Sequence, residues 1–146
     1  CFAETDVRPM GRDAAGVRGI RLDDGDEVVS AAVAAESKSL LTVTENGYGK
    51  RTAVEAYLRG EDRQPQTRGG KGLRNYRLTG KTGLVAGAAI VDDTNDVMLI
   101  ESGGVVLRTP AASINLYGRD TQGVILMRIE EGNRVIGVEA ISNTEE

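Results

Sequence analysis

The feature that most constrains this chain is an internal repeat. Three short boxes, at residues 11–17, 67–73 and 118–124, carry an arginine in the second position and a glycine in the sixth. The sixth-position glycines, Gly16, Gly72 and Gly123, are separated by 56 and 51 residues. Each box leads into an apolar run, which predicts strands at 17–22, 73–78 and 124–129. Repeats of this length are typical of propellers and solenoids, whose units bury their apolar faces only against each other.

A second signature recurs at a spacing of 57 residues. Residues 41–52 and 98–109 each place two strand-like runs around a short turn, Asn46-Gly47 in the first and Gly103-Gly104 in the second. Such dipeptides favour two-residue hairpins with type I′ turns, which need positive φ at both central positions. Each repeat therefore supplies about four short strands, the content of a propeller blade.

The composition agrees with an all-β chain that has many turns. The 146 residues include 19 glycines but no tryptophan, one phenylalanine and four tyrosines, so Val, Ile, Leu and Ala must form the core. We expect one domain, 1–146, with repeat units at about 1–39, 40–96 and 97–141 and an acidic end at 142–146. Residues 2–8 stand where 109–115 stand in the last unit, so we expect a fragment of a longer chain. Helices have little room, the stretch 52–58 being short.

Several kinds of function are excluded by residue counts. Histidine is absent and cysteine occurs once, as Cys1, so catalytic sites with a histidine base, zinc sites and internal disulfides are not expected. No apolar run approaches the roughly 18 residues that a membrane span needs. We therefore expect no catalytic residue of the histidine type, no metal site and no membrane partner, and a cytoplasmic location.

Several stretches resemble the C-terminal DNA-wrapping domain of the DNA gyrase A subunit, namely residues 7–12, 16–22, 46–52 and 118–124. The resemblance runs from about residue 2 to residue 141. Residues 66–72 resemble the hallmark box of that family and depart from it at Thr67, where arginine is usual. Because later blades of the family carry looser copies of the box, residues 66–72 are interpreted as a copy from the later half of the domain.

The resemblance implies a fold and a function. The fold would be a partial β-pinwheel, a propeller relative whose four-stranded blades exchange strands, covering about half of a six-bladed domain. The function would be to bind, bend and wrap duplex DNA without reading its sequence, in support of ATP-dependent negative supercoiling. Partners would be double-stranded DNA, the remainder of the gyrase A subunit and the gyrase B subunit, in the bacterial cytoplasm and nucleoid. The fragment would not itself be an enzyme, and ATP and magnesium would be used by other parts of gyrase.

The charge distribution is compatible with a DNA partner although the total is acidic. The whole chain has a formal charge of −4, yet residues 47–81 hold nine basic and three acidic side chains. Arginine forks and glycine-flanked backbone amides are suited to phosphate. The expected DNA-binding side chains are Arg68, Lys71, Arg63, Arg74, Lys50, Arg51, Arg12 and Arg119. The expected backbone of the hallmark box is Gln66, Gly69, Gly70 and Gly72.

Other interpretations of these residues remain open. The basic segment could consist of solvated charges on strands and loops, in a propeller fragment that serves as a protein-interaction platform. The C-terminal domain of the topoisomerase IV A subunit shares the architecture and is a second alternative. Gly80-Lys81-Thr82 resembles the end of a nucleotide-binding loop, but the position five residues earlier is Asn75 where that loop needs glycine, which favours a simple turn.

Overall fold

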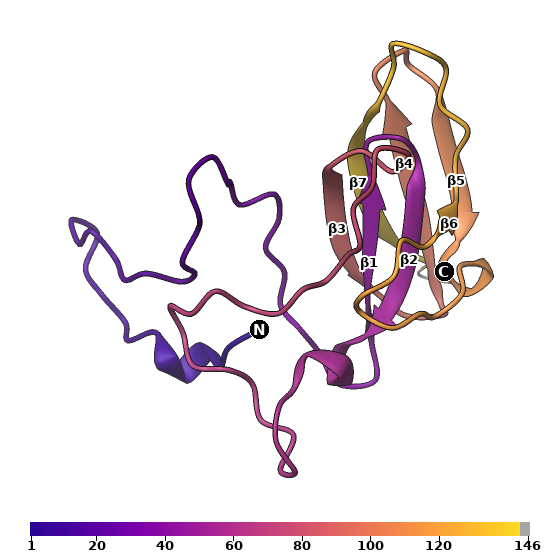
Figure 1. Ribbon diagram of the computed structural model, residues 1–146. Helices are drawn as coiled ribbons and strands as arrows, with labels where there is room; N and C mark the ends of the chain where they lie inside the picture. Colours follow the sequence, from indigo (N-terminus) through magenta and orange to yellow (C-terminus); the bar gives the residue numbers. More distant parts are fainter. Residues whose placement is uncertain (144–146) are drawn as a thin grey trace. The chain divides into compact units, whose positions relative to one another are not determined.

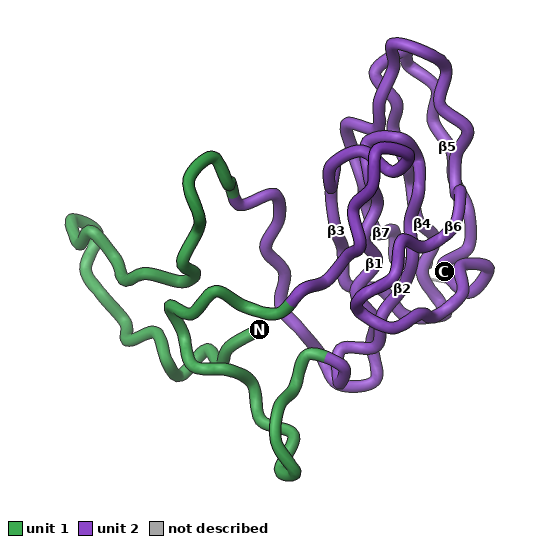
Figure 2. The backbone as a smooth tube through the Cα atoms, viewed as in Figure 1, with its two compact units in different colours: residues 1–27, 57–73 green, residues 28–56, 74–146 purple. Residues whose placement is uncertain are grey.

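The structure, a computed structural model, describes residues 1–143, so residues 144–146 of the expected acidic end lie outside the described residues. It consists of strands, turns and irregular backbone, with three short 3-10 turns as its helical elements between residues 1 and 143 (Figure 1). The chain divides into two compact units (Figure 2). Unit 1 comprises residues 1–27 and 57–73, and unit 2 comprises residues 28–56 and those from 74 onward. The expected all-β class is confirmed.

The first sheet of unit 2 has four antiparallel strands. They are β1 (Ser39–Thr44), β2 (Tyr48–Ala53), β3 (Val85–Val91) and β6 (Val124–Ile125), in the order β3-β1-β2-β6. The hairpin expected at Asn46-Gly47 is confirmed, but the prediction of a type I′ turn is wrong. The amide of Gly47 donates to the Thr44 carbonyl, and Gly47 has φ +81° whereas Asn46 is not in the left-handed region. This is a three-residue loop that ends in a left-handed glycine.

The second sheet of unit 2 contains three antiparallel strands. They are β4 (Asn95–Glu101), β5 (Val106–Pro110) and β7 (Val135–Ser142), in the order β5-β4-β7. The hairpin between β4 and β5 repeats the first one, since the amide of Gly104 donates to the Glu101 carbonyl and Gly104 has φ +94°. Burial alternates along β4, as expected for a strand with one face toward a core.

A single apolar core joins the two sheets of unit 2. Its fully buried side chains are aliphatic, as the shortage of aromatic residues predicts, and include Leu41, Val43, Val91, Val97 and Leu99. The sheets approach closely where a Cβ at Gly87 of β3 would lie 2.9 Å from the Val138 side chain of β7. Burying each of these aliphatic side chains contributes roughly 1.5–3 kcal/mol.

Sheet pairing crosses the expected boundaries of the repeat units. Strand β6 follows box 3 (118–124) but pairs with β2, which precedes box 2 (67–73). Residues 17–22 and 73–78, which match β6 and its continuation, form no strand, so that expectation is wrong. The reason is that neither range forms a ladder with a strand among the described residues. An apolar run without a partner strand has unsatisfied backbone groups and stays irregular.

Unit 1 is built mainly from loops. Residues 66–70 are joined to the N-terminal stretch by a bridge between Phe2 and Gln66 and by the bonds Gly69 N–H to Gly19 O and Arg21 N–H to Gly70 O. Its larger apolar side chains in residues 1–27 remain more than a third exposed: Phe2, Val7, Met10, Val17, Ile20 and Leu22. Unit 1 therefore depends on backbone hydrogen bonds more than on a core.

Three 3-10 turns occupy matching places in the repeat. They are η1 (Glu4–Asp6), η2 (Val54–Tyr57) and η3 (Ala111–Ser113). The match of residues 2–8 with 109–115 is thereby confirmed, and the possible helix at 52–58 is one 3-10 turn. Among residues 1–143, no helix is long and apolar enough to cross a bilayer.

Candidate nucleic-acid interface

The three boxes have the same backbone conformation at their sixth position. Gly16, Gly72 and Gly123 have φ values of +79°, +82° and +67°, in the left-handed region where side chains are disfavoured. At Gly123 the space is also closed, because an added Cβ would meet the Gly49 carbonyl oxygen of β2 at 2.3 Å. The recurring glycine therefore lets each box adopt a left-handed backbone conformation at this position.

Box 2 carries two of the expected phosphate-binding cations in unit 1, one half-buried and one exposed. Arg68 is half-buried, and it donates from Nε to the Asp6 carbonyl (3.0 Å) and from Nη1 to the Arg18 carbonyl (2.6 Å). The Lys71 ammonium lies 2.7 Å from the Asp23 carboxylate, and both side chains are more than 60% exposed. Such exposed pairs are weak, so a phosphate can compete for the lysine.

Box 3 repeats the contacts of box 2 within unit 2. Arg119 Nη1 donates to the Arg74 carbonyl (3.1 Å), and Arg68 Nη1 makes the same bond to the Arg18 carbonyl. The two accepting residues match, because Arg18 directly follows the first box (11–17) and Arg74 directly follows box 2. The amide of Arg77 donates to the Thr121 carbonyl (3.0 Å), in the same way as Arg21 bonds Gly70. The arginines of boxes 2 and 3 therefore have a structural role, since each anchors its loop to the segment that follows the preceding box.

Two further arginines flank box 3 and share one carboxylate. Arg74 Nη1 and Arg77 Nε each lie 3.5 Å from an oxygen of Asp120. Their side chains are 72% and 62% exposed, which leaves them accessible to a phosphate. Arg74 was expected at the interface and Arg77 was not, although both follow box 2 in the sequence. The signal that could have found Arg77 is its place in the basic segment 47–81.

Lys50 was expected to contact DNA and is instead buried, which is a correction. Its ammonium donates to the carbonyls of Gly118 and Arg119 and to the Thr121 hydroxyl, and it lies 5.0 Å from the centre of the Tyr76 ring. With the side chain 0% exposed, the three ammonium donors have partners inside the protein. Burial lowers the pKa of Lys50 to about 8 against the opposing attraction of Asp120, and the nearby Arg119 lowers it further. Lys50 thus supports box 3 through hydrogen bonds from its buried ammonium to the backbone and side chain of the loop.

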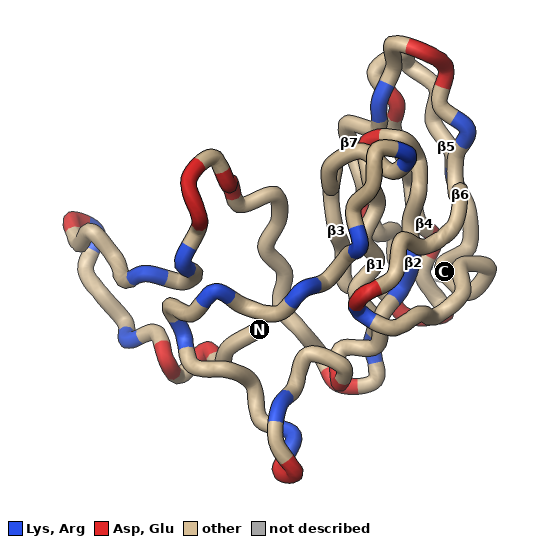
Figure 3. Tube along the Cα trace, in the orientation of Figure 1, with Lys and Arg blue, Asp and Glu red and all other residues tan. Residues whose placement is uncertain are grey.

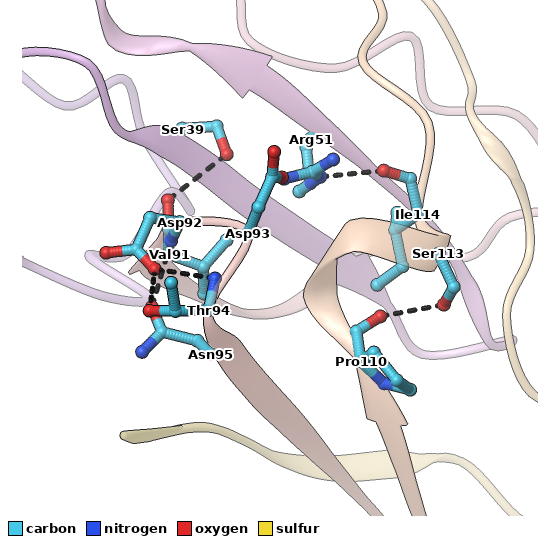
Figure 4. A network of polar contacts seen from close by, with 10 residues as sticks. All are labelled: Ser39, Arg51, Val91, Asp92, Asp93, Thr94, Asn95, Pro110, Ser113 and Ile114. Atoms are coloured by element: carbon cyan, nitrogen blue, oxygen red, sulfur yellow. Dashed lines mark hydrogen bonds and ion pairs between the residues drawn. The ribbon is translucent and has the colours of Figure 1, made fainter. Parts of the chain in front are cut away.

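Arg51 is a second correction of the same kind. Its side chain is 6% exposed, Nε donates to the Ile114 carbonyl (2.7 Å), and Nη1 pairs with Asp93 (2.6 Å). Figure 4 shows the guanidinium between these two partners, next to the Asp92–Asn95 turn, where the Thr94 hydroxyl and amide hold the pKa of Asp92 below its usual value. Arg51 therefore joins β2 to the loop after η3, and it is not placed to bind a phosphate.

The remaining expected residues lie in exposed or half-buried positions of unit 1. Arg12 and Arg63 are exposed, and Arg63 has φ +47° in the turn that its amide closes on the Gly60 carbonyl. The side-chain nitrogen of Gln66 is buried and has no hydrogen-bond partner among the described residues. Gly69 takes φ +83° and uses its amide on Gly19, while Gly70 is exposed.

Basic and acidic positions are interleaved in both units (Figure 3). The basic segment 47–81 is shared between the units, because residues 57–73 belong to unit 1 and the rest to unit 2. Within the described part of the chain, no group of three or more histidine, cysteine, aspartate or glutamate residues is arranged to hold a metal ion. Each unit carries exposed cations, which are Arg12, Arg63 and Lys71 in unit 1 and Arg74 and Arg77 in unit 2, and one half-buried box arginine, which is Arg68 in unit 1 and Arg119 in unit 2.

Comparison with known sequences finds one family across the chain. The model of the DNA gyrase C-terminal domain, a β-propeller, matches residues 2–35, 38–60, 64–92 and 95–142. The DNA gyrase A subunit of Escherichia coli K12 is 44% identical over 141 residues, which cover 97% of this chain and 15% of that protein. The DNA gyrase A subunit of Mycobacterium tuberculosis is 40% identical over 139 residues, covering 94% of this chain and 16% of that protein. The chain thus spans about a sixth of the length of these relatives.

Comparison with solved structures finds the same architecture. The gyrase A C-terminal domain superposes with a TM-score of 0.84 at 29% identity, over 96% of this chain and 46% of that one. The C-terminal domain of topoisomerase IV gives a TM-score of 0.85 at 24% identity, over 97% of this chain and 42% of that one, a likeness of fold. The expected partial β-pinwheel, about half of the solved domain, is confirmed. The chain belongs to the DNA gyrase C-terminal domain family.

Proposed function

We propose that this chain binds duplex DNA through backbone phosphates, without reading the base sequence, and helps to bend and wrap it. The observation that carries the proposal is the repeated box loop, which presents Arg68 and Lys71 in unit 1 and Arg119 with its neighbours Arg74 and Arg77 in unit 2. Guanidinium and ammonium groups on glycine-rich loops bind phosphates and position the duplex, whereas sequence preference comes from DNA bendability. Membership of the family supports this function.

The wider activity is proposed from the named relatives. As part of the DNA gyrase A subunit, the chain supports ATP-dependent negative supercoiling, together with the remainder of that subunit and with the gyrase B subunit, in the bacterial cytoplasm and nucleoid. It makes no catalytic contribution of its own, and ATP and magnesium act in other parts of the enzyme. Two points support the assignment of catalysis to other parts of the enzyme. The chain has no histidine, and its exposed arginines are assigned to phosphate contact.

The proposal predicts a specific response to salt. Affinity for fluorescent duplexes of unrelated sequence, measured by anisotropy with the full-length protein, should agree within a few-fold. The logarithm of the affinity should fall linearly with the logarithm of the salt concentration, by roughly 0.9 for each phosphate contact. Binding that depends strongly on one sequence, or that does not respond to salt, would contradict the proposal and favour a protein-interaction platform.

The second candidate is the corresponding domain of topoisomerase IV, favoured by the structural match at TM-score 0.85. The two candidates differ in the expected DNA geometry, because wrapping with a fixed hand changes the linking number of a closed circle. Incubating the full-length protein with relaxed circular DNA and a nicking-closing enzyme separates them. A shift in linking number supports the gyrase role, and salt-dependent binding without a shift supports the topoisomerase IV role.

A further inference from the structure

Asp120 lies between two exposed arginines of unit 2. Its Oδ2 is 3.5 Å from Nη1 of Arg74, and its Oδ1 is 3.5 Å from Nε of Arg77. The carboxylate is 48% exposed and both guanidiniums are more exposed than that, so all three groups face solvent. One anion with an oxygen on each of two guanidiniums is the arrangement in which arginine pairs also hold a phosphate.

The position of Asp120 is set by its loop. Lys50 binds the carbonyls of Gly118 and Arg119 on one side of Asp120, and the amide of Arg77 binds the Thr121 carbonyl on the other. The carboxylate is therefore held near the arginines by the backbone on both sides of it. Since exposed ion pairs are weak, an incoming phosphate can displace the carboxylate without disturbing the loop.

Box 2 differs from box 3 at this position. The residue that matches Asp120 is Gly69, which has no side chain to offer a cation. The carboxylate that pairs with Lys71 comes instead from Asp23, outside the box. Box 3 thus supplies the carboxylate, Asp120, to arginines outside the box, whereas box 2 supplies the cation, Lys71, to a carboxylate outside the box.

We propose that Asp120 is an internal counter-ion, which occupies a phosphate subsite formed by Arg74 and Arg77 until duplex DNA displaces it. The proposal rests on the proposed function and adds a regulation of the same site. By holding the subsite, Asp120 weakens the contribution of box 3 to DNA binding relative to that of box 2. A negative side chain between two arginines also repels the phosphate that approaches them, which further lowers the affinity.

The test compares neutral and charged variants of the full-length protein in the same anisotropy assay. Asp120→Asn removes the charge and keeps the shape, Asp120→Glu keeps the charge, and Glu131→Gln removes an exposed charge elsewhere in unit 2. We expect Asp120→Asn to raise the affinity about fivefold, the equivalent of about 1 kcal/mol. Asp120→Glu should stay close to the wild type, and Glu131→Gln should change the affinity less than twofold.

Three results would overturn the proposal. Equal gains from Asp120→Asn and Glu131→Gln would mean that net charge alone matters, and a weaker affinity of Asp120→Asn would mean that the carboxylate orients the arginines for DNA. Adding Arg74→Ala and Arg77→Ala to Asp120→Asn should abolish the gain, whereas a gain that persists would also refute the subsite. Unchanged circular dichroism shows that each variant is folded. Wild-type protein that fails to bind DNA would contradict the proposed function itself, which is a separate result.

Discussion

Box 2 and box 3 share a left-handed glycine at the sixth position and an arginine that bonds a backbone carbonyl, but they differ in what else holds them. Box 3 rests on Lys50, a fully buried lysine whose ammonium binds two carbonyls and a hydroxyl of the loop. Box 2 is held by a half-buried arginine, Arg68, and by backbone bonds to residues 19 and 21. The box sequence therefore recurs with the left-handed glycine and the arginine contact, whereas a buried side chain of the neighbouring strand β2 adds further hydrogen bonds to box 3 alone.

The largest effect on stability is expected from the glycine at the sixth position. Gly123→Ala should lower the free energy of unfolding by roughly 3–5 kcal/mol, since a left-handed alanine is strained and its Cβ would collide with the Gly49 carbonyl. Gly72→Ala should cost about 1–2 kcal/mol, because its Cβ would lie at an ordinary 3.7 Å from the Ile20 side chain. Urea denaturation followed by circular dichroism measures both values. Equal losses would show that the two boxes are packed alike.

The next variant removes the support beneath box 3. Lys50→Met keeps the length of the side chain but leaves the loop carbonyls of Gly118 and Arg119 without their buried donor. We expect a loss of roughly 2–4 kcal/mol, because hydrogen bonds to a charged group are strong and unsatisfied buried acceptors are costly. Lys81→Met, at an exposed position, is the matched control and should stay within about 0.5 kcal/mol. A loss below 1 kcal/mol for Lys50→Met would contradict the support role.

The lowered pKa of Lys50 predicts how the stability of the fold depends on pH. Its pKa is about 8 in the folded chain and about 10.5 in the unfolded chain, so between these values the unfolded chain binds the extra proton and stability rises with pH. Burial raises the pKa of Tyr76, which reverses the trend once unfolded tyrosine ionises near pH 10. Between pH 8 and pH 10, unfolding should become less favourable by roughly 1–2 kcal/mol in the wild type. The rise should vanish in Lys50→Met, and a rise that survives there must come from another group.

The smallest effect on stability is expected in box 2. Lys71→Ala breaks the pair with Asp23, but both side chains are more than 60% exposed, so the loss should be about 0–1 kcal/mol. Thermal unfolding at low and high salt gives the measurement, and the difference between wild type and variant should shrink as salt screens the pair. A loss of more than 2 kcal/mol would place Lys71 among the structural residues, together with Lys50.

The repeat predicted the all-β class and both hairpins, because a short glycine turn between strand-like runs is a local signal. It failed at residues 17–22 and 73–78, since a strand also needs a partner and the sequence pattern does not reveal which hairpin supplies it. The type I′ turns failed for a related reason: Gly47 and Gly104 close three-residue loops, whose length depends on the strand register.

The candidate site was predictable in its boxes and not in its individual cations. Lys50 and Arg51 look like Arg68 and Lys71 in the sequence, yet their places on β2 put Lys50 beneath box 3 and Arg51 against the loop after η3. A basic residue inside a strand-like run can be buried, and a count of charges does not distinguish buried from exposed side chains. Arg77 illustrates the opposite case, because it lies outside the boxes and becomes significant only through Asp120.

The proposed function depends on a division between exposed or half-buried cations of the boxes, which contact DNA phosphates, and fully buried cations, which only support the fold. The most direct measurement is the salt dependence of duplex affinity for the full-length protein with Arg68→Ala and Lys71→Ala combined, compared with Arg134→Ala, which changes a residue in the turn before β7. The double variant should bind all sequences more weakly, with a slope of log affinity against log salt flatter by roughly one to two. Arg134→Ala should leave the slope unchanged. An unaltered affinity and slope in a folded double variant would contradict this division.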